Sequence, residues 1–306
     1  MLLAEASIAL FAFSGKFWSL TAAGVTQGAV VALAAVGFLI IFKATGVVNF
    51  AQGDMITLGA YLALWLSKDH GWPILGAYAG AVVLMFLIGV VLERVAYAPL
   101  RGRSVHVVVI ATLGAAIVMR TIIAIWQGAS PVALATPLKG RIWRVGGAAI
   151  SYHRIAIVIV TLLVVAALLW LFERTSFGRQ VRALASDRET AMLYGVRVGR
   201  MSMIAFGLSA ALAGLGGVLI APSQSSFDIT LGFGVMLGGF AAAILGGFGS
   251  LAGVVAGGFL IGLVEQLVGG YVMRDYRAAY PFLLMILVIA FRPSGLFSRG
   301  ASHERL

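Results

Sequence analysis

The sequence contains no cysteine and few charged residues. Without cysteine the chain can form neither disulfide bonds nor thiolate metal sites. Charged residues make up only 11% of the 306 residues, whereas a soluble domain carries about 25%. So few charges cannot cover the outer surface of a folded chain of this size. We therefore expect much of that surface to face lipid.

Several functional signatures are also missing from the sequence. It has no P-loop pattern G-x-x-x-x-G-K-[ST], so ATP must be handled by another chain if it is used at all. The four histidines are scattered without metal-ligand spacing, and neither a Ser–His–Asp arrangement nor an H-E-x-x-H motif is present. We expect no catalytic residue, no metal site and no bound cofactor, and a membrane enzyme is the weakest interpretation.

Hydrophobic residues make up 61% of the chain, and the mean hydropathy is +1.03. The apolar runs are continuous rather than alternating, which favours helices and excludes a barrel. The 39 glycines suit a membrane bundle, where small residues let helices approach closely. We predict one all-α polytopic membrane domain over residues 1–306, with about eight to nine transmembrane or half-membrane helices.

The predicted membrane segments follow the apolar runs, since a full span needs roughly 20 residues. Two of them, 55–66 and 280–291, are too short to cross comfortably alone. The segments are 20–42, 55–66, 74–92, 105–126, 155–172, 201–221, 231–245, 251–271 and 280–291.

The net charge of +11 lies mainly in the loops between the apolar runs, so it indicates the positive-inside rule rather than nucleic-acid binding. The loops 94–103 and 173–200 and the C-terminal tail fall on one side and are rich in arginine. This predicts a cytoplasmic C-terminus and an N-terminus outside. The loop 127–154 disagrees, because it carries basic residues and no acid on the opposite side.

Two short apolar segments resemble each other in sequence. Leu58-Gly59-Ala60-Tyr61-Leu62-Ala63 is similar to Leu237-Gly238-Gly239-Phe240-Ala241-Ala242, and the two cross in opposite directions in the predicted topology. One interpretation is an inverted-topology repeat, which is a transporter architecture. The other is a chance match between two small-residue helices.

The longest charged loop contains a short predicted helix. Ser186 followed by Glu189 has the spacing of a capping box, and Gly195 stands where a glycine would end the helix. One interpretation is a solvated or interfacial loop helix. The other is a helix that docks into a partner, which the loop's length favours because a connector needs only a few residues.

Four motifs stand out along the chain. They are Gly46-Val47-Val48-Asn49-Phe50-Ala51-Gln52-Gly53-Asp54, Leu58-Gly59-Ala60-Tyr61, the loop with Gly178-Arg179, Arg182-Ala183, Asp187, Ala191 and Gly195, and Gly246-Gly247-Phe248-Gly249-Ser250-Leu251-Ala252-Gly253. Together they resemble the LivH family, the permeases of branched-chain amino acid ABC importers. The resemblance covers nearly the whole chain, although the family often has His where Gln52 stands. Relatives also serve urea, short amides and other amino acids.

The resemblance implies a permease subunit in the bacterial inner membrane. A periplasmic binding protein would deliver substrate, a second LivM-like permease would pair with this chain, and two cytoplasmic ATPase subunits would hydrolyse ATP. The loop 173–200 would hold the coupling helix. The residues expected to couple to the ATPase are Arg182, Asp187, Arg188, Glu189, Ala191 and Gly195.

Asn49, Gln52 and Asp54 are polar residues expected at membrane depth, where polar groups are costly and often functional. The functional interpretation is a substrate pathway. In the structural interpretation, Asp54 caps the following short helix and Asn49 satisfies a broken backbone.

Glu265 lies inside a predicted span, so it needs a partner, water or a proton. A proton-coupling carboxylate would make the chain a stand-alone secondary transporter, the main alternative. The other interpretation is a satisfied residue near the outer boundary or at a subunit interface. Arg120 is expected to snorkel to the outer end of its helix. Gly249, Gly253 and Gly257 repeat every four residues and predict a small face for tight helix packing.

Overall fold

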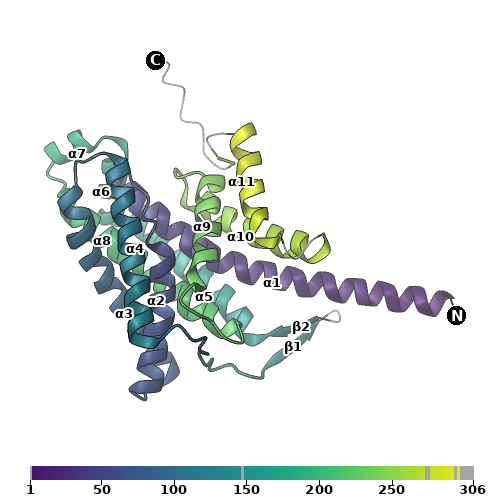
Figure 1. Ribbon diagram of the computed structural model, residues 1–306. Helices are drawn as coiled ribbons and strands as arrows, with labels where there is room; N and C mark the ends of the chain where they lie inside the picture. The colour runs from purple at the N-terminus through teal and green to yellow at the C-terminus, as the bar shows by residue number, and fades with distance from the viewer. Residues whose placement is uncertain (1, 146–147, 273–275, 293–294, 297–306) are drawn as a thin grey trace.

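The computed structural model describes residues 2–145, 148–272, 276–292 and 295–296, which form a bundle of helices and one hairpin (Figure 1). The helices are α1 (Leu2–Thr45), α2 (Gln52–Leu64), α3 (Ile74–Leu92), α4 (Val105–Gln127), α5 (Tyr152–Arg174), α6 (Ser176–Ser186), α7 (Arg188–Leu193), α8 (Val198–Ile220), α9 (Leu231–Gly246), α10 (Leu251–Tyr271) and α11 (Tyr280–Phe291). Strands β1 (Ile142–Val145) and β2 (Ala148–Ser151) pair antiparallel. Shorter helical turns cover Trp65–Asp69, Glu93–Tyr97, Ala98–Leu100, Ala221–Ser223 and Arg277–Ala279.

The membrane prediction is confirmed. Six helices in the described residues are long and apolar enough to cross a bilayer. The shorter apolar helices α9 and α11 and the buried α2 bring the set close to the predicted eight to nine. The bounds of α3, α10 and α11 match the predicted segments, and α3 and α11 each end directly before a charged residue, Glu93 and Arg292.

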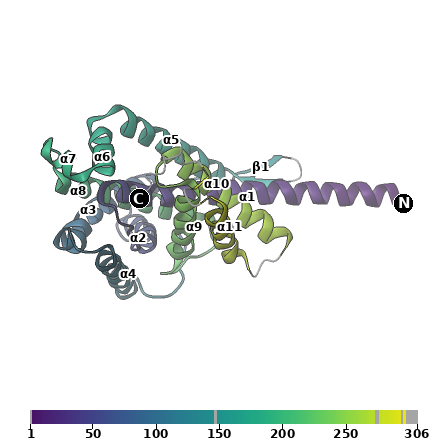
Figure 2. The same cartoon turned by 90° about the horizontal axis from the view of Figure 1, so that it is seen from above.

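Helix α1 runs across the whole molecule, and α5, α8, α9 and α10 pack against it (Figures 1 and 2). Residues 29–41 of α1 are almost completely buried. At 1.5 Å per residue its 44 residues span about 65 Å, roughly twice the hydrocarbon core of a bilayer. Its N-terminal part therefore extends beyond the bundle, as Figure 1 shows.

Helix α2 forms the centre of the other half of the molecule. All 13 of its residues are buried, because α3, α4, α8 and α9 surround it. By contrast α3, α4 and α5 expose large aliphatic side chains, such as Leu75, Ile110 and Leu163, which are 66 to 69% exposed. These three helices therefore present an exposed apolar surface of the kind that lipid can cover.

Contacts between segments far apart in sequence show which loops share an end of the bundle. At the end that carries α6 and α7, Lys43 Nζ donates to the Gly249 carbonyl at 2.9 Å and Arg101 donates to Ser202 Oγ at 2.9 Å. Leu296, after α11, donates its N–H to the Leu245 carbonyl at the same end. We call this the α7 end; most of the basic tail that was predicted there lies outside the described residues.

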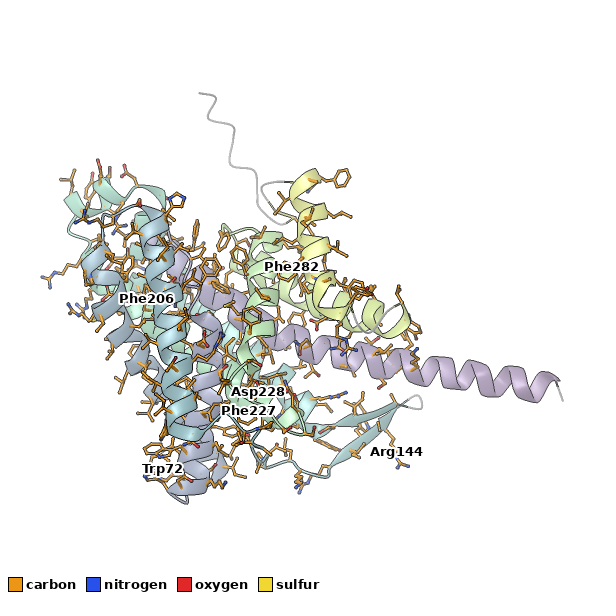
Figure 3. All side chains as sticks on the ribbon, in the orientation of Figure 1. Trp72, Arg144, Phe206, Phe227, Asp228 and Phe282 are labelled. Atoms are coloured by element: carbon orange, nitrogen blue, oxygen red, sulfur yellow. The ribbon has the colours of Figure 1, made fainter. Side chains whose placement is uncertain are left out.

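The opposite end, which we call the hairpin end, holds β1, β2 and the loops next to them (Figure 3). There the Tyr78 hydroxyl donates to the Ala135 carbonyl at 2.8 Å, and Val132 forms a backbone bridge with Phe227. The loops 94–103 and 173–200 thus lie at one end of the bundle, and the loop 127–154 lies at the other. This agrees with the predicted topology, which placed the first two loops on one side of the membrane and the third on the opposite side.

The hairpin itself was not predicted. Arg144, from the loop that disagreed with the positive-inside count, lies on β1 and is exposed (Figure 3). Arg141, directly before β1, is exposed as well. The sequence carries a signal for it, since Gly146 and Gly147 separate two short apolar runs and paired glycines favour tight hairpin turns.

The predicted packing face of Gly249, Gly253 and Gly257 is wrong for Gly249, which lies in the loop before α10, whereas Gly253 and Gly257 lie in α10 against α9. A Cβ at Gly257 would stand 2.6 Å from the Ala242 carbonyl, while a Cβ at Gly249 would meet open space. Gly253 contributes backbone, because a Cβ on Gly246 of α9 would collide with it. The absence of a side chain at Gly257 therefore lets the backbones of α9 and α10 approach closely.

The two glycines provide a matched test of this packing. We expect Gly257→Ala to destabilise the folded chain by about 1–3 kcal/mol, the usual cost of overpacking, and Gly249→Ala to leave it unchanged. Thermal unfolding of both variants in the same detergent measures the difference. Equal midpoints would show that α9 and α10 do not need this close contact.

Candidate functional site

The chain is interrupted between α1 and α2, as the sequence predicts. Gly46 adopts a φ of +76°, a conformation that favours glycine, and residues 46–51 leave the helical path before α2 begins at Gln52. Gln52 lies beside Ser209, near the middle of α8. The interruption is therefore at membrane depth, where irregular backbone is tolerated only if protein surrounds it.

Side chains supply the hydrogen bonds that the interrupted backbone lacks. Asn49 is fully buried and its side-chain oxygen accepts from a main-chain N–H two residues later. This confirms the expectation that Asn49 satisfies a broken backbone. The bonds are Val47 N–H to Thr45 Oγ1 (3.4 Å), Phe50 N–H to Thr112 Oγ1 (3.3 Å) and Ala51 N–H to Asn49 Oδ1 (3.1 Å).

Gln52 connects the start of α2 to α8. The Ser209 hydroxyl donates to Gln52 Oε1 at 3.0 Å, and Gln52 Nε2 donates to the Ser209 carbonyl at 3.4 Å. The amide rests against Gly37 of α1, where any Cβ would collide with it. Gln52 is thus fully buried with both amide atoms partnered.

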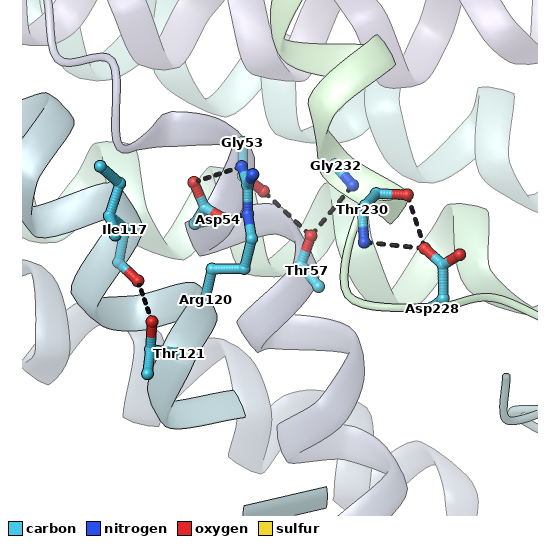
Figure 4. Close-up of polar contacts among 9 residues, drawn as sticks. All are labelled: Gly53, Asp54, Thr57, Ile117, Arg120, Thr121, Asp228, Thr230 and Gly232. Atoms are coloured by element: carbon cyan, nitrogen blue, oxygen red, sulfur yellow. Dashed lines mark hydrogen bonds and ion pairs between the residues drawn. The ribbon is translucent and has the colours of Figure 1, made fainter. Parts of the chain in front are cut away.

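Asp54 forms an ion pair with Arg120 of α4 (Figure 4). Arg120 Nε lies 2.8 Å from Asp54 Oδ1 and one terminal nitrogen lies 3.2 Å from Oδ2. Two expectations are therefore wrong. Asp54 does not cap α2, whose N-cap Ala51 has no side-chain bond. Arg120 turns inward, because in hydrocarbon a buried carboxylate offers it a stronger partner than the membrane surface.

The first turn of α9 is fastened to α2 just beyond this ion pair (Figure 4). The Gly232 N–H donates to Thr57 Oγ1 at 3.0 Å, and the Thr57 hydroxyl donates to the Gly53 carbonyl at 3.2 Å. A Cβ on Gly232 would collide with that carbonyl. Helices α2, α4 and α9 are therefore joined through polar groups around the interrupted segment.

The loop before α9 has its own polar anchor. The Thr230 hydroxyl and N–H both donate to Asp228 Oδ1, at 2.6 and 2.8 Å, and these bonds hold the pKa of Asp228 below its usual value. The carboxylate thus stays charged and fixes the turn that leads into α9 (Figure 4).

The charged loop at the α7 end contains two helices rather than one. Helix α6 was not predicted, and it runs through Ser186. Ser186 is therefore not the N-cap of the next helix, and the predicted capping box is wrong. Asp187 caps α7 instead, accepting from the N–H groups of Glu189 and Thr190. The hydroxyl and N–H of Thr190, with the Glu189 N–H, hold the pKa of Asp187 below its usual value.

Helix α7 is a small exposed projection with an apolar tip. Leu193 and Tyr194 are 87% and 86% exposed, whereas Ala191 is 4% exposed and faces the protein. Gly195 has a φ of +83° and donates to the Met192 carbonyl at 3.0 Å, which ends the helix as predicted.

The other residues expected to couple to an ATPase lie around α7. Arg182 donates to the Phe172 carbonyl near the end of α5, and Arg188 donates to the Thr45 carbonyl at the end of α1 at 3.5 Å. Glu189 is exposed. The structure thus gathers these residues at one end of the molecule.

Glu265 lies elsewhere, toward the hairpin end of α10. It lines a cavity of about 180 Å³ together with Gln27 of α1 and Gln224 after α8. This cavity is separate from the interrupted segment, so the structure does not bring Glu265 together with Asn49, Gln52 or Asp54.

Sequence reasoning missed the partners of the predicted polar residues. Thr57, Thr112 and Ser209 stand alone in apolar segments and resemble ordinary packing residues. A hydroxyl inside a predicted span is itself a signal, because such groups hydrogen-bond across helices. That signal says a partner exists but not which one.

The chain is similar over most of its length to known proteins. The family described as "Branched-chain amino acid transport system / permease component" matches residues 20–289. The chain is 32% identical over 289 residues to the high-affinity branched-chain amino acid transport system permease protein LivH of Escherichia coli K12, covering 90% of this chain and 94% of LivH.

The permease protein BraD of Pseudomonas aeruginosa, from a transport system of the same description, is 32% identical over 288 residues, with 90% and 94% of the two chains covered. Among solved structures, a chain of PsaBC from Streptococcus pneumoniae in complex with Fab aligns over 92% of this chain and 95% of that chain, with a TM-score of 0.48 and 13% identity.

Proposed function

Since the chain belongs to the family of permease components of branched-chain amino acid transport systems, we propose that it forms half of the translocation pathway of an ABC importer for branched-chain or similar small amino acids. The observation that carries this proposal is the family match, which extends over residues 20–289. A transport permease is not an enzyme, so hydrolysis of ATP falls to partner subunits.

The proposed complex contains a second, LivM-like permease, two ATPase subunits and a periplasmic binding protein. Exposed Leu193 and Tyr194 on α7 support an ATPase contact at the α7 end. The arginine-rich loops at that end support a cytoplasmic location for it, with the N-terminus outside the inner membrane.

We propose that Asn49, Gln52 and Asp54 act on the translocation pathway indirectly, without binding the substrate. Their polar atoms are engaged within the chain, so they would shape the pathway by holding the interrupted helix. This suits a cargo with apolar side chains, which needs few polar groups along its route.

The main alternative is a stand-alone transporter that uses Glu265 as a proton-coupling group. Family membership favours the importer.

Uptake by proteoliposomes tests the proposal. Vesicles with both permeases, the ATPase subunits and internal ATP should accumulate labelled leucine when the binding protein is added. Vesicles with this chain alone should not accumulate it under a proton gradient. Gradient-driven uptake by the chain alone would overturn the importer. Labelled urea and alanine in the same assay identify the substrate class.

A further inference from the structure

The α7 end contains a large hollow between α1, α5, α6 and α10. One part has a volume of about 720 Å³, and an adjoining part of about 660 Å³ shares Lys43, Arg182 and Gly249 with it. Arg188 lines the second part. Three cations therefore line these two adjoining spaces at the level where the membrane helices end.

Lys43, Arg182 and Arg188 have more hydrogen-bond donors and more positive charge than their contacts within the chain satisfy. Each donates to a backbone carbonyl: Lys43 to Gly249, Arg182 to Phe172 and Arg188 to Thr45. In the described part of the chain none of the three pairs with a carboxylate. An ammonium has three donors and a guanidinium five, so most of these donors remain available to a ligand.

Below the cations the hollow becomes apolar. Leu39, Leu169 and Ala256 line it, and each lies four residues, or about one helical turn, from a lining residue nearer the surface on α1, α5 or α10. The walls thus change from charged to aliphatic along the direction that leads into the membrane.

Two further features indicate that the ligand is negatively charged. The first turn of α10 lines the hollow, and a helix N-terminus carries partial positive charge. Glu173 is the acidic residue among the lining residues, and it is exposed. The remaining charge around the hollow is positive, so an anion would relieve repulsion among the cations.

We propose that this hollow binds one anionic phospholipid, with the phosphate at Lys43, Arg182 and Arg188 and an acyl chain along Leu39, Leu169 and Ala256. Basic pockets between membrane helices bind anionic headgroups in this way. A free phosphate would satisfy the cations but not the apolar wall, whereas a neutral lipid would fill the wall and leave the cations unpaired. The inference needs the chain to lie in a membrane but does not depend on what it transports.

Native mass spectrometry of the assembled complex tests this inference. The complex is extracted from vesicles of equal phosphatidylglycerol and phosphatidylcholine, and the retained lipids are counted. We expect retention of phosphatidylglycerol to fall about fivefold in Lys43→Gln and in Arg188→Gln, since one basic residue near an anionic headgroup contributes roughly 1 kcal/mol. The control Arg179→Gln, an exposed α6 residue outside the hollow, should retain lipid as the original chain does.

The midpoint of thermal unfolding of each variant is measured as well, to show that the variant is folded. If Lys43→Gln fails to assemble, Arg188→Gln alone tests the retention of phosphatidylglycerol. Equal retention of the two lipids by the original complex would overturn the inference. So would unchanged retention in both variants, or displacement of the lipid by millimolar inorganic phosphate, which would identify the site as one for a small free anion.

Discussion

Replacing Arg120 with leucine is expected to be among the most damaging single changes in this protein. The Asp54 side chain is 4% exposed and would lose its ion-pair partner. Breaking a buried ion pair from one side costs about 3–5 kcal/mol, and the low end applies because the Arg120 side chain is 39% exposed. Thermal unfolding in lipid nanodiscs should show the loss.

Two further variants isolate the ion pair as the cause. Thr121→Leu changes the next residue, whose hydroxyl bonds only to Ile117 in its own helix (Figure 4), and should leave the midpoint near that of the original chain. Adding Asp54→Asn to Arg120→Leu should recover most of the stability, because no unpaired charge remains. A double variant as unstable as the single one would contradict this account.

The same double variant also tests the proposed pathway. If it folds and still supports uptake of leucine at the original rate, Asp54 acts only on the stability of the interrupted helix. If it folds but uptake falls, the geometry around Asp54 matters for translocation as well. Uptake is compared at equal amounts of folded protein, so a difference in uptake cannot result from a difference in folding.

The second large effect concerns the tip of α7. The double change Leu193→Ser and Tyr194→Ser should lower binding-protein-stimulated uptake at least tenfold, which corresponds to about 1.4 kcal/mol. Both side chains are more than 85% exposed, so the free chain loses no packing. Large apolar and aromatic side chains at the centre of an interface contribute most of its binding energy.

The control for the tip is Val95→Ser, an apolar residue 72% exposed on the segment after α3 at the same end. It should leave uptake unchanged.

Glu189→Lys and a bulky replacement of Ala191 should also uncouple hydrolysis from uptake, although Ala191 is buried and would act by displacing α7. Uptake at the original level in the tip variant would make α7 an ordinary loop helix.

Most of the fold follows from local features of the sequence. Continuous apolar runs of about 20 residues predict membrane helices, and α3 and α11 end directly before a charged residue. Helix α6 and the hairpin were missed because both occur in polar or mixed segments, where periodicity over a few residues is weak.

The candidate site was predictable in its residues but not in their roles. The sequence shows that Asn49, Gln52 and Asp54 are polar groups in an apolar region, and one of the two interpretations made Asp54 a helix cap. Its partner Arg120 is 66 residues away, a pairing that no local pattern encodes.

The sequence by itself determined that this protein is a helical membrane bundle with arginine-rich loops at one end, because burial of backbone in lipid leaves few alternatives. The tertiary structure alone decided which polar groups meet: Gln52 with Ser209, Asp54 with Arg120, and three cations around one hollow. Hydropathy is a property of each residue, whereas hydrogen bonds and ion pairs depend on distances of a few ångströms between helices. Those distances are set only when the helices pack.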